Sequence, residues 1–468
     1  MSARTEAAAF HRRARAKVED LDHRQKLAKA TATYHAAVAA GRTQFVDWEA
    51  ARSRAQAIKH EAVNHLHRYL LEFERAAAQR GTRVFWAGTA AEARDYILGV
   101  LREAGCRKVV KSKSMVTEEI HLNAALAEAG IEPLETDLGE YIQQLSGEPP
   151  YHIVTPAMHK SKAEISRLFT EKLGIAPTED PGELTMAARR ALRQAFLEAD
   201  AGITGANFLV AETGHIAVTE NEGNARLSFS LPRLHIAVAG MERVVPRIAD
   251  LAHLWPLLAT SGTGQRMTCY NSLLGGPATA GEGDGPREMH VVLLDNGRSA
   301  ILADPERREA LQCIRCGACL NACPIFNNIG GHAYGTTYQG PIGSVITPLL
   351  RPMAEWSHLS YASSLCGRCA EVCPVRIELH HHLLRNRRDA TRARHSGKGL
   401  ERLIFRLWAW FVADARRYER SARLARLAMR FPWQPPVPGW SRSREVPRLA
   451  ERSFREWWRK HGTRTRQS

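Results

Sequence analysis

The stretch Cys313-Ile-Arg-Cys316-Gly-Ala-Cys319-Leu-Asn-Ala-Cys323-Pro324 has the spacing C-x2-C-x2-C-x3-C-P. This spacing is characteristic of bacterial iron–sulfur sites, in which three closely spaced thiolates wrap one corner of a cubane cluster. The chain then turns into a helix that carries the fourth cysteine away, so the fourth thiolate ligates a different cluster. The stretch therefore predicts two clusters and requires a second motif downstream.

That second motif is Cys366-Gly-Arg-Cys369-Ala-Glu-Val-Cys373-Pro374. Because the last cysteine of each motif crosses to the other cluster, the ligands of the two clusters can be assigned. We expect the first cluster to be held by Cys313, Cys316, Cys319 and Cys373. We expect the second to be held by Cys366, Cys369 and Cys323, and both clusters are most simply [4Fe–4S].

The second motif is one ligand short, because Ser363 stands where its first cysteine would be. The fourth ligand could be the Ser363 oxygen, a nearby histidine, water or substrate, or the site could hold a [3Fe–4S] cluster. The sequence leaves these alternatives open. Structural zinc is the alternative for the whole set, but zinc sites usually use two separated cysteine pairs. The close series followed by C-P favours iron–sulfur.

Other metal-binding candidates are weaker. Cys106 and Cys269 are isolated, and a free cysteine is mostly a small buried hydrophobe. His380, His381 and His382 follow the second motif, where one of them could ligate or tune a cluster. We expect them instead to be exposed polar residues at the start of a helix.

Length and composition predict a globular protein of several units. A chain of 468 residues exceeds one ordinary domain, and the net charge of +16 points to an acidic partner, anionic lipid or nucleic acid, or to solvated surface alone. The first residues have no apolar core, and no run approaches the length of about 18 apolar residues that crosses a bilayer. We therefore expect a cytoplasmic protein with reduced or metal-bound cysteines.

Hydrophobic spacing predicts the organisation ahead of the cysteine motifs. Apolar residues at helical spacing predict a helical hairpin over residues 14–80, followed by alternating strands and helices that imply a largely parallel sheet. The Gly-rich residues 262–286 match no phosphate-binding motif and predict a mobile turn or a ligand-gating loop. The expected strands are residues 84–86, 108–110, 151–154, 207–212, 215–219, 234–239 and 290–294. The expected units are residues 1–80, 81–300, 301–395 and 396–468.

Five further segments carry a resemblance over nearly the whole chain. They are Lys111-Ser-Lys-Ser-Met-Val-Thr-Glu-Glu119, Gly205-Ala-Asn-Phe-Leu-Val-Ala-Glu-Thr-Gly214, Thr219-Glu-Asn-Glu-Gly-Asn224, Asp295-Asn-Gly-Arg298 and Gly330-Gly-His-Ala-Tyr-Gly335. With the cysteines, they make the chain resemble the lactate-utilisation protein B family. The resemblance implies an α/β (LUD-type) domain similar to the sugar-phosphate isomerase and CoA-transferase fold, an all-α two-cluster ferredoxin domain and a basic helical tail. Serine in the eighth ligand position is usual in that family.

The resemblance also implies a function. Members act with two partner proteins in oxidising L-lactate to pyruvate, a reaction that releases two electrons, whereas each cluster passes one electron at a time. The chain has no flavin or nicotinamide fingerprint, so we expect an electron-transfer subunit whose acceptor the sequence does not reveal.

Two rival functions remain open. In the first, the α/β domain is itself a catalytic site for a small 2-hydroxy acid, with Glu212, Glu220 and Glu222 as acid, base or nucleophile. We favour their interpretation as ordinary turn and strand-end carboxylates. In the second, the protein is a redox-sensing or nucleic-acid-binding protein, because its C-terminal region is rich in arginine. The aromatic residues 404–412 within that region favour packing first, peripheral membrane contact second and nucleic acid last.

Overall fold

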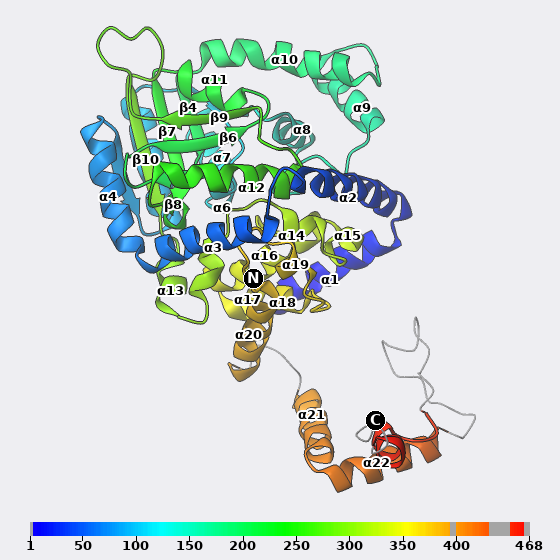
Figure 1. Cartoon of the computed structure of the whole chain (residues 1–468). Helices are drawn as coiled ribbons and strands as arrows, with labels where there is room; N and C mark the ends of the chain where they lie inside the picture. Colours follow the sequence, from blue (N-terminus) through cyan, green and yellow to red (C-terminus); the bar gives the residue numbers. More distant parts are fainter. Residues whose placement is uncertain (1–2, 394–398, 430–449, 463–468) are drawn as a thin grey trace. The chain divides into compact units, whose positions relative to one another are not determined.

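The computed structural model describes residues 3–393, 399–429 and 450–462. The chain forms two compact units, residues 1–395 and residues 396–468, which we describe separately (Figure 1). No helix among the described residues is both long and apolar enough to cross a membrane.

The centre of the first unit is a six-stranded sheet with the order β1-β10-β7-β4-β2-β3. All neighbouring strands in it are parallel. Its strands are β1 (Arg83–Ala87), β2 (Lys108–Lys111), β3 (Glu132–Glu135), β4 (Ala201–Gly205), β7 (Leu234–Gly240) and β10 (Glu288–Leu294). Every residue of the central strand β7 is buried, as expected for a parallel strand covered on both faces. The prediction of a largely parallel α/β sheet is confirmed.

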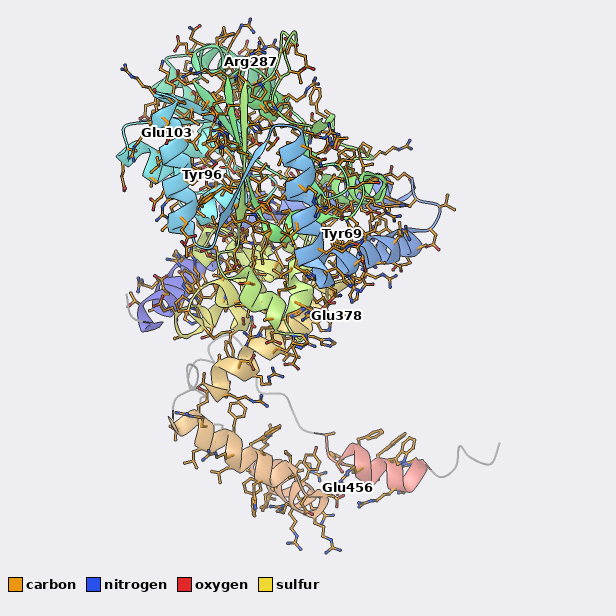
Figure 2. All side chains as sticks on the ribbon, turned by 90° about the vertical axis from the view of Figure 1, so that its left-hand side faces the viewer. Tyr69, Tyr96, Glu103, Arg287, Glu378 and Glu456 are labelled. Carbon is orange, nitrogen blue, oxygen red and sulfur yellow. The ribbon has the colours of Figure 1, made fainter. Side chains whose placement is uncertain are left out.

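Helices cover both faces of this sheet. Side chains alternate along β10, so Met289, Val291 and Leu293 pack with α4 (Leu66–Gln79), whereas Val292 and Leu294 pack with α5 (Ala90–Glu103). Figure 2 shows Tyr69 on α4 and Tyr96 on α5, with the strands between the two helices. The remaining helices of this region are α6 (Met115–Glu119), α7 (Leu122–Glu128), α8 (Leu138–Ser146), α9 (Lys162–Leu173), α10 (Pro181–Glu198), α11 (Asn224–Ser230), α12 (Leu251–Thr263) and α13 (Arg298–Ala303).

A second, four-stranded sheet has the order β8-β5-β6-β9. Its strands are β5 (Phe208–Val210), β6 (Ile216–Glu220), β8 (Val244–Val245) and β9 (Tyr270–Leu274). Strand β9 pairs antiparallel with β6, so the Gly-rich residues 262–286 contain a paired strand and are not simply a turn. The strand expected at residues 151–154 is wrong, because the backbone bends there and buries Tyr151 and His152 individually.

The N-terminal region contains four helices, so the prediction of one hairpin over residues 14–80 is wrong. They are α1 (Ala3–Glu19), α2 (Leu21–Arg42), α3 (Trp48–Asn64) and α4. Asp20 and Asp47 cap α2 and α3 by accepting backbone N–H bonds, which starts a new helix at each of these positions. Helices α1 and α2 pack on the cysteine-motif region, which we define as residues 301–393, and α4 packs on the sheet.

The cysteine-motif region contains no strand among its described residues. Its helices are α14 (Ala318–Asn321), α15 (Phe326–Ile329), α16 (Gly340–Leu350), α17 (Met353–Trp356), α18 (His358–Tyr361), α19 (Arg368–Glu371) and α20 (Leu379–Arg392). One apolar core continues from this region into the α/β region, since Phe326 and Ile342 cluster with Phe208 and Leu254. The two regions therefore share buried surface and form one compact unit.

A buried polar network also links the α/β region to the cysteine-motif region. Arg298 donates to Glu242 at 2.6 Å and to Glu119 at 2.8 Å, and all three residues are almost completely inaccessible to solvent. Tyr338 of the cysteine-motif region donates its hydroxyl proton to Glu119 at 2.6 Å. Removing one partner from such a network leaves an uncompensated buried charge, so its geometry is strongly constrained.

The second unit consists of α21 (Gly399–Val412), α22 (Ala415–Ala428) and α23 (Phe454–His461). No residue of these helices is buried, and Phe405, Trp408 and Trp410 are each more than half exposed. Glu456 on α23, labelled in Figure 2, pairs with Arg426 of α22. The prediction of a basic helical C-terminal region is confirmed for its described part.

Candidate functional site

Cysteines from both motifs meet around one small hollow. It is lined by Cys313, Cys316, Cys319 and Cys373, and aliphatic side chains, including Ile153 and Ile342, form the rest of its wall. Four thiols with apolar surroundings fit the donor set and environment of a cubane iron–sulfur cluster. These four residues are the ligand set expected for the first cluster.

The remaining motif cysteines form a second group. The charges of Cys366 and Cys323 act on Cys369, and the charge of Cys366 acts on Cys323, so the three thiols are close neighbours. Cys323 and Cys369 are buried, whereas Cys366 is exposed. The second group is thus closer to solvent than the first.

The backbone repeats itself between the two motifs. Arg315 and Leu365 both have a left-handed conformation, with φ of 61° and 56°, and Gly317 and Gly367 both have φ of 80°. A four-residue helix follows each glycine, α14 in the first motif and α19 in the second. Both loops therefore present their cysteines with the same local geometry.

Ser363 occupies the place that this repeat gives to Cys313. The Cys313 sulfur accepts the backbone N–H of Arg315 at 3.4 Å, and the Ser363 hydroxyl accepts that of Leu365 at 3.1 Å. The side chain of Ser363 therefore points as a ligand in this position would. Its oxygen is a weaker, harder donor for iron than a thiolate.

The buried thiols are held protonated by their surroundings. Burial raises the pKa of Cys369 to about 11 and that of Cys373 to about 12. Because a metal ligand must be the thiolate, metal binding has to release these protons and supply the compensating positive charge.

The other sulfur and imidazole candidates lie elsewhere. Cys106 is buried as expected, whereas Cys269 is exposed, so the expectation of a buried hydrophobe is wrong for Cys269. His382 is buried and pairs with Glu309 at 2.8 Å, so the expectation that all three neighbouring histidines are exposed is wrong for His382. His380 and His381 lie close to Glu378 at the start of α20.

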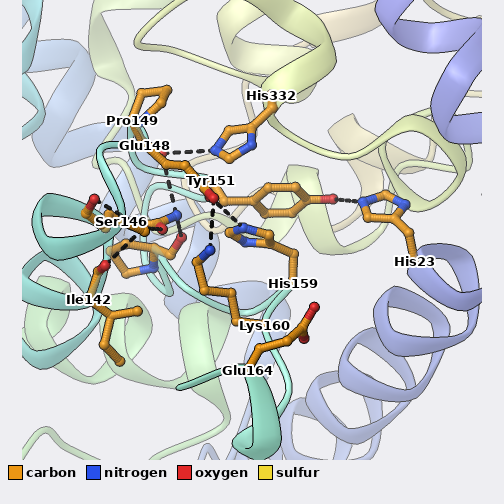
Figure 3. Close-up of polar contacts among 12 residues, drawn as sticks. His23, Ile142, Ser146, Glu148, Pro149, Tyr151, His159, Lys160, Glu164 and His332 are labelled. Atoms are coloured by element: carbon orange, nitrogen blue, oxygen red, sulfur yellow. Dashed lines mark hydrogen bonds and ion pairs between the residues drawn. The ribbon is translucent and has the colours of Figure 1, made fainter. Parts of the chain in front are cut away.

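A second histidine cluster joins three parts of the chain (Figure 3). The Tyr151 hydroxyl lies 2.7 Å from His23 of α2, and His332 of the cysteine-motif region contacts the Pro149 carbonyl at 2.8 Å. Glu148 is paired with both His159 and Lys160. Because the Lys160 ammonium already neutralises Glu148, this cluster is explained as an ion-pair network.

A larger cavity of about 330 Å³ lies beside the first cysteine group, and we call it the Cys316 cavity. Its wall combines the carboxyl ends of β2 and β4, the turn after β6, the end of α12 and the loop that carries Cys316. Ligands of open parallel sheets commonly bind outside the carboxyl ends of the strands. Its residues include Lys113, Ser114, Asp137, Asn207, Glu220, Glu222, Arg243, Gln265, Arg315 and Cys316.

The structure separates the three glutamates that were candidates for catalysis. Glu220 and Glu222 line the Cys316 cavity, but Glu212 does not, and it accepts the backbone N–H of Ile248 instead. Glu220 accepts the N–H groups of Ala225 and Arg226, which makes it a structural acceptor for α11.

Glu222 also accepts a backbone N–H, that of Leu138 at 3.0 Å. Burial, and then the negative charge of Asp137, raise the pKa of Glu222 to about 7. A carboxyl group with a pKa near neutral is able to exchange protons at physiological pH. Glu222 is therefore the strongest acid–base candidate of the three glutamates.

Two arginines of this cavity were not identified from the sequence. Arg243 is 7% exposed and follows β7 through a short 3-10 helix (Met241–Arg243). Arg315 lies between two expected ligands, Cys313 and Cys316, and this position within the motif could have identified it as a residue close to the cluster. Arg243 had no local signal, because only the folded chain brings it to the cysteines.

Comparisons with known proteins cover nearly the whole chain. Residues 70–294 match the family model described as LUD domain, residues 309–377 the 4Fe-4S dicluster domain, and residues 381–463 the C-terminal region of lactate utilisation protein B. The 4Fe-4S dicluster match supports iron–sulfur clusters as the cofactors of the cysteine-motif region.

Relatives match over nearly their full length. Lactate utilization protein B of Geobacillus sp. (strain WCH70) is 42% identical over 98% of this chain and 99% of its own. The uncharacterized electron transport protein YkgF of Escherichia coli (strain K12) is 43% identical over 98% of each chain. A crystal structure of a duf162 family protein from Deinococcus radiodurans is 18% identical and covers 49% of this chain and 98% of its own, with a TM-score of 0.28, which is too low to support an argument.

Proposed function

The chain belongs to the lactate utilisation protein B family, and we propose that it is the iron–sulfur electron-transfer subunit of a multiprotein system that oxidises L-lactate to pyruvate. The observation that carries this proposal is the hollow in which four cysteines from two separate motifs converge. The relative named as an electron transport protein is consistent with it.

We assign the first cluster to Cys313, Cys316, Cys319 and Cys373, and the second to Cys323, Cys366 and Cys369. Ser363 is our candidate for the eighth ligand, supported by the backbone repeat that places it opposite Cys313. A [4Fe–4S] cluster exchanges one electron at a time, so two of them suit a relay from a two-electron donor. The protein's own contribution is to hold the thiolates, exclude water from the first site and leave the second near the surface.

The remaining parts of the proposal concern partners and domains. We propose that the chain acts in the cytoplasm with two partner proteins and passes its electrons to an acceptor that is still unassigned. We also propose that it comprises the four expected units and that its α/β region resembles the sugar-phosphate isomerase and CoA-transferase fold. Trp408 and its exposed apolar neighbours on α21 support a contact with a partner or with anionic lipid. Flotation with anionic vesicles that is lost in Trp408→Glu but kept in Leu71→Glu, an exposed leucine on α4, would identify lipid as the occupant.

The relay and a catalytic α/β region predict different activities for the isolated chain. We would purify the full-length protein without oxygen, measure iron and acid-labile sulfide, and identify each centre by spin resonance. The relay predicts about eight irons per chain, about four for each cubane, and reduction by L-lactate only when partners are added. Colourless protein loaded with zinc would refute the relay. Reduction of the isolated chain by lactate would instead favour catalysis in the α/β region, with Glu222 as its leading residue.

A further inference from the structure

We infer that the Cys316 cavity is a binding site for a small carboxylate anion, held by Arg243 directly beside the first cysteine group. The site itself follows from geometry and charge. The narrower ligand class, a 2-hydroxy or 2-oxo acid, rests on the proposed function. No electron-transfer step within the cavity is part of the inference.

Arg243 is a buried cation whose Nε lacks an acceptor within the described part of the chain. Arg243 is 7% exposed as a residue and lines the cavity, its buried Nε has no hydrogen-bond partner, and its guanidinium forms no ion pair within 4 Å among the described residues. The adjacent carboxylate of Glu242 is already taken, since it accepts from Arg298 at 2.6 Å and from Arg315 at 3.4 Å. A buried charged donor without an acceptor is costly, so an external acceptor is expected at Arg243.

Positive charge accumulates at the wall of the Cys316 cavity that carries Arg243. Arg315, whose side chain is 7% exposed, has no partner for Nε and Nη1 and stacks over Tyr338 at 4.7 Å. Lys113 also lines the cavity and contacts the Val154 carbonyl at 2.7 Å. Burial and the nearby positive charge of Arg315 lower the pKa of Arg243, which is the expected effect of crowding like charges.

The opposing negative charge is weakened. Burial raises the pKa values of both Glu220 and Glu222, and that of Glu222 reaches about 7, so part of the Glu222 charge is lost near neutral pH. Asp137 lies 3.7 Å from Lys113 and compensates that lysine rather than the arginines. The region around Arg243 and Arg315 therefore retains a positive potential.

The chemistry of the residues that line the cavity favours a small carboxylate as its ligand. A guanidinium binds a carboxylate through two parallel N–H bonds, which favours this group over a single-point anion. The Glu222 carboxylate is able to accept a hydrogen bond from a hydroxyl group of the ligand, and the amide of Asn207 adds a neutral polar contact surface. A volume of about 330 Å³ accommodates a small acid together with water.

The cavity also brings together segments of the chain that carry no expected cluster ligand. Three of the five resemblance segments contribute to its wall, through Lys113, Asn207 and Glu222. Gly262, in the Gly-rich stretch, approaches the cysteine loop so closely that a Cβ there would lie 3.0 Å from the Cys316 carbonyl oxygen. A ligand in the cavity would consequently lie against the first cysteine group.

The alternative is that the arginines only balance the charge of thiolates. The negative charge of Cys313 does act on both Arg243 and Arg315. That role alone requires no ligand, so it predicts that Arg243→Met changes the reduction potential of the first cluster while no anion binds to the wild-type protein.

The test is calorimetric titration of the cluster-loaded, full-length protein with pyruvate, L-lactate, acetate and inorganic phosphate. We expect saturable binding of pyruvate or L-lactate, weaker binding of acetate and a change in the spin-resonance signal of the first cluster. Arg243→Met should weaken binding by about tenfold to a hundredfold, as expected for losing charged hydrogen bonds. Arg266→Met, an exposed arginine beside the cavity residue Gln265, is the matched control and should change binding by less than about twofold.

Each outcome decides the inference. Absence of saturable binding to the wild-type protein, binding of phosphate alone, or binding that Arg243→Met leaves unchanged would each overturn it. If Arg243→Met does not fold, Arg243→Lys keeps the positive charge and should still lose affinity, because lysine cannot form the bidentate pair. Cluster-loaded protein that binds no carboxylate would refute this inference alone, whereas cluster-free protein that binds pyruvate would refute the electron relay alone.

Discussion

The two cysteine motifs share one backbone but differ in what covers them. A Cβ added at Gly317 in the first motif would lie 2.9 Å from Val154 and 3.2 Å from His152 of the α/β region, whereas one at the equivalent Gly367 would meet nothing within 4 Å. Cys316 is buried, and its counterpart Cys366 is exposed. Local sequence thus makes the two loops alike, and packing makes the first an inner site and the second an outer one.

This difference bears on where the proposed relay exchanges electrons with its partners. The inner group adjoins the Cys316 cavity, whereas Cys366 of the outer group is exposed. The charge of Cys369 in the outer group acts on Cys319 in the inner group, so the two groups are neighbours. We expect a partner protein to exchange electrons with the outer group.

The largest expected effect comes from breaking the crossing of ligands between motifs. Cys373→Ser should eliminate the spin-resonance signal of the inner cluster, although Cys373 belongs to the outer motif, and should lower iron from about eight to about four per chain. Cys323→Ser should eliminate the outer signal instead. Iron analysis and spin resonance measure both, with Cys269→Ser as the control that leaves them unchanged. Loss of the outer signal in Cys373→Ser would contradict the assignment.

The next effect concerns the network that attaches the covering α/β region to the cysteine-motif region. Arg298→Met leaves the buried Glu119 carboxylate without its cation and the buried Glu242 carboxylate with only Arg315, and should lower the free energy of unfolding by about 3–5 kcal/mol. Denaturant unfolding measures this change. Arg83→Met removes an ion pair with Glu288 in which both side chains are over a third exposed, and should cost less than about 1 kcal/mol. Equal effects of the two substitutions would show that the network does not stabilise the fold.

A smaller effect is expected from making the two motifs chemically alike. Ser363→Cys should give the outer cluster a fourth thiolate and change its spin-resonance signal and reduction potential, leaving the inner signal as it is. Ser363→Ala should change the outer signal in a different way, because it removes the oxygen. If Ser363→Ala and wild type have identical outer signals, then Ser363 is not the ligand.

The smallest effect concerns the pH dependence of the stability of the α/β region, to which His235 contributes independently of the clusters. Burial lowers the pKa of His235, on β7, to about 3. Between pH 6.5 and 3 the unfolded chain binds a proton there that the folded chain does not, so stability falls as pH falls through this range. His235→Gln should reduce the slope by up to about 1.4 kcal/mol per pH unit between pH 6 and 5. The exposed His253→Gln is the control, and an unchanged slope in His235→Gln would contradict the prediction.

How much could be predicted depended on how local the determinants are. The cysteine positions and strands β1, β2, β7 and β10 followed from spacing and apolar runs. Strands β3 and β4 were missed, since Glu-Pro-Leu-Glu and Ala-Gly-Ile-Thr-Gly have weak strand preference and are strands because their neighbours pair with them. The expected strand at residues 151–154 failed for the opposite reason: its apolar residues pack in the shared core, but its backbone bends and pairs with no strand of the described chain.

The sequence by itself determined the cysteine spacing, the repeated loop geometry and the alternation of strands and helices, because each depends on residues only a few positions apart. The tertiary structure alone decided which motif is covered, where the Cys316 cavity lies and that Arg243 and Arg315 both line it. Those features require residues that are 72 to 202 positions apart, namely Lys113, Arg243 and Arg315, to meet. Their proximity results from long-range packing around the shared apolar core, which no local pattern encodes.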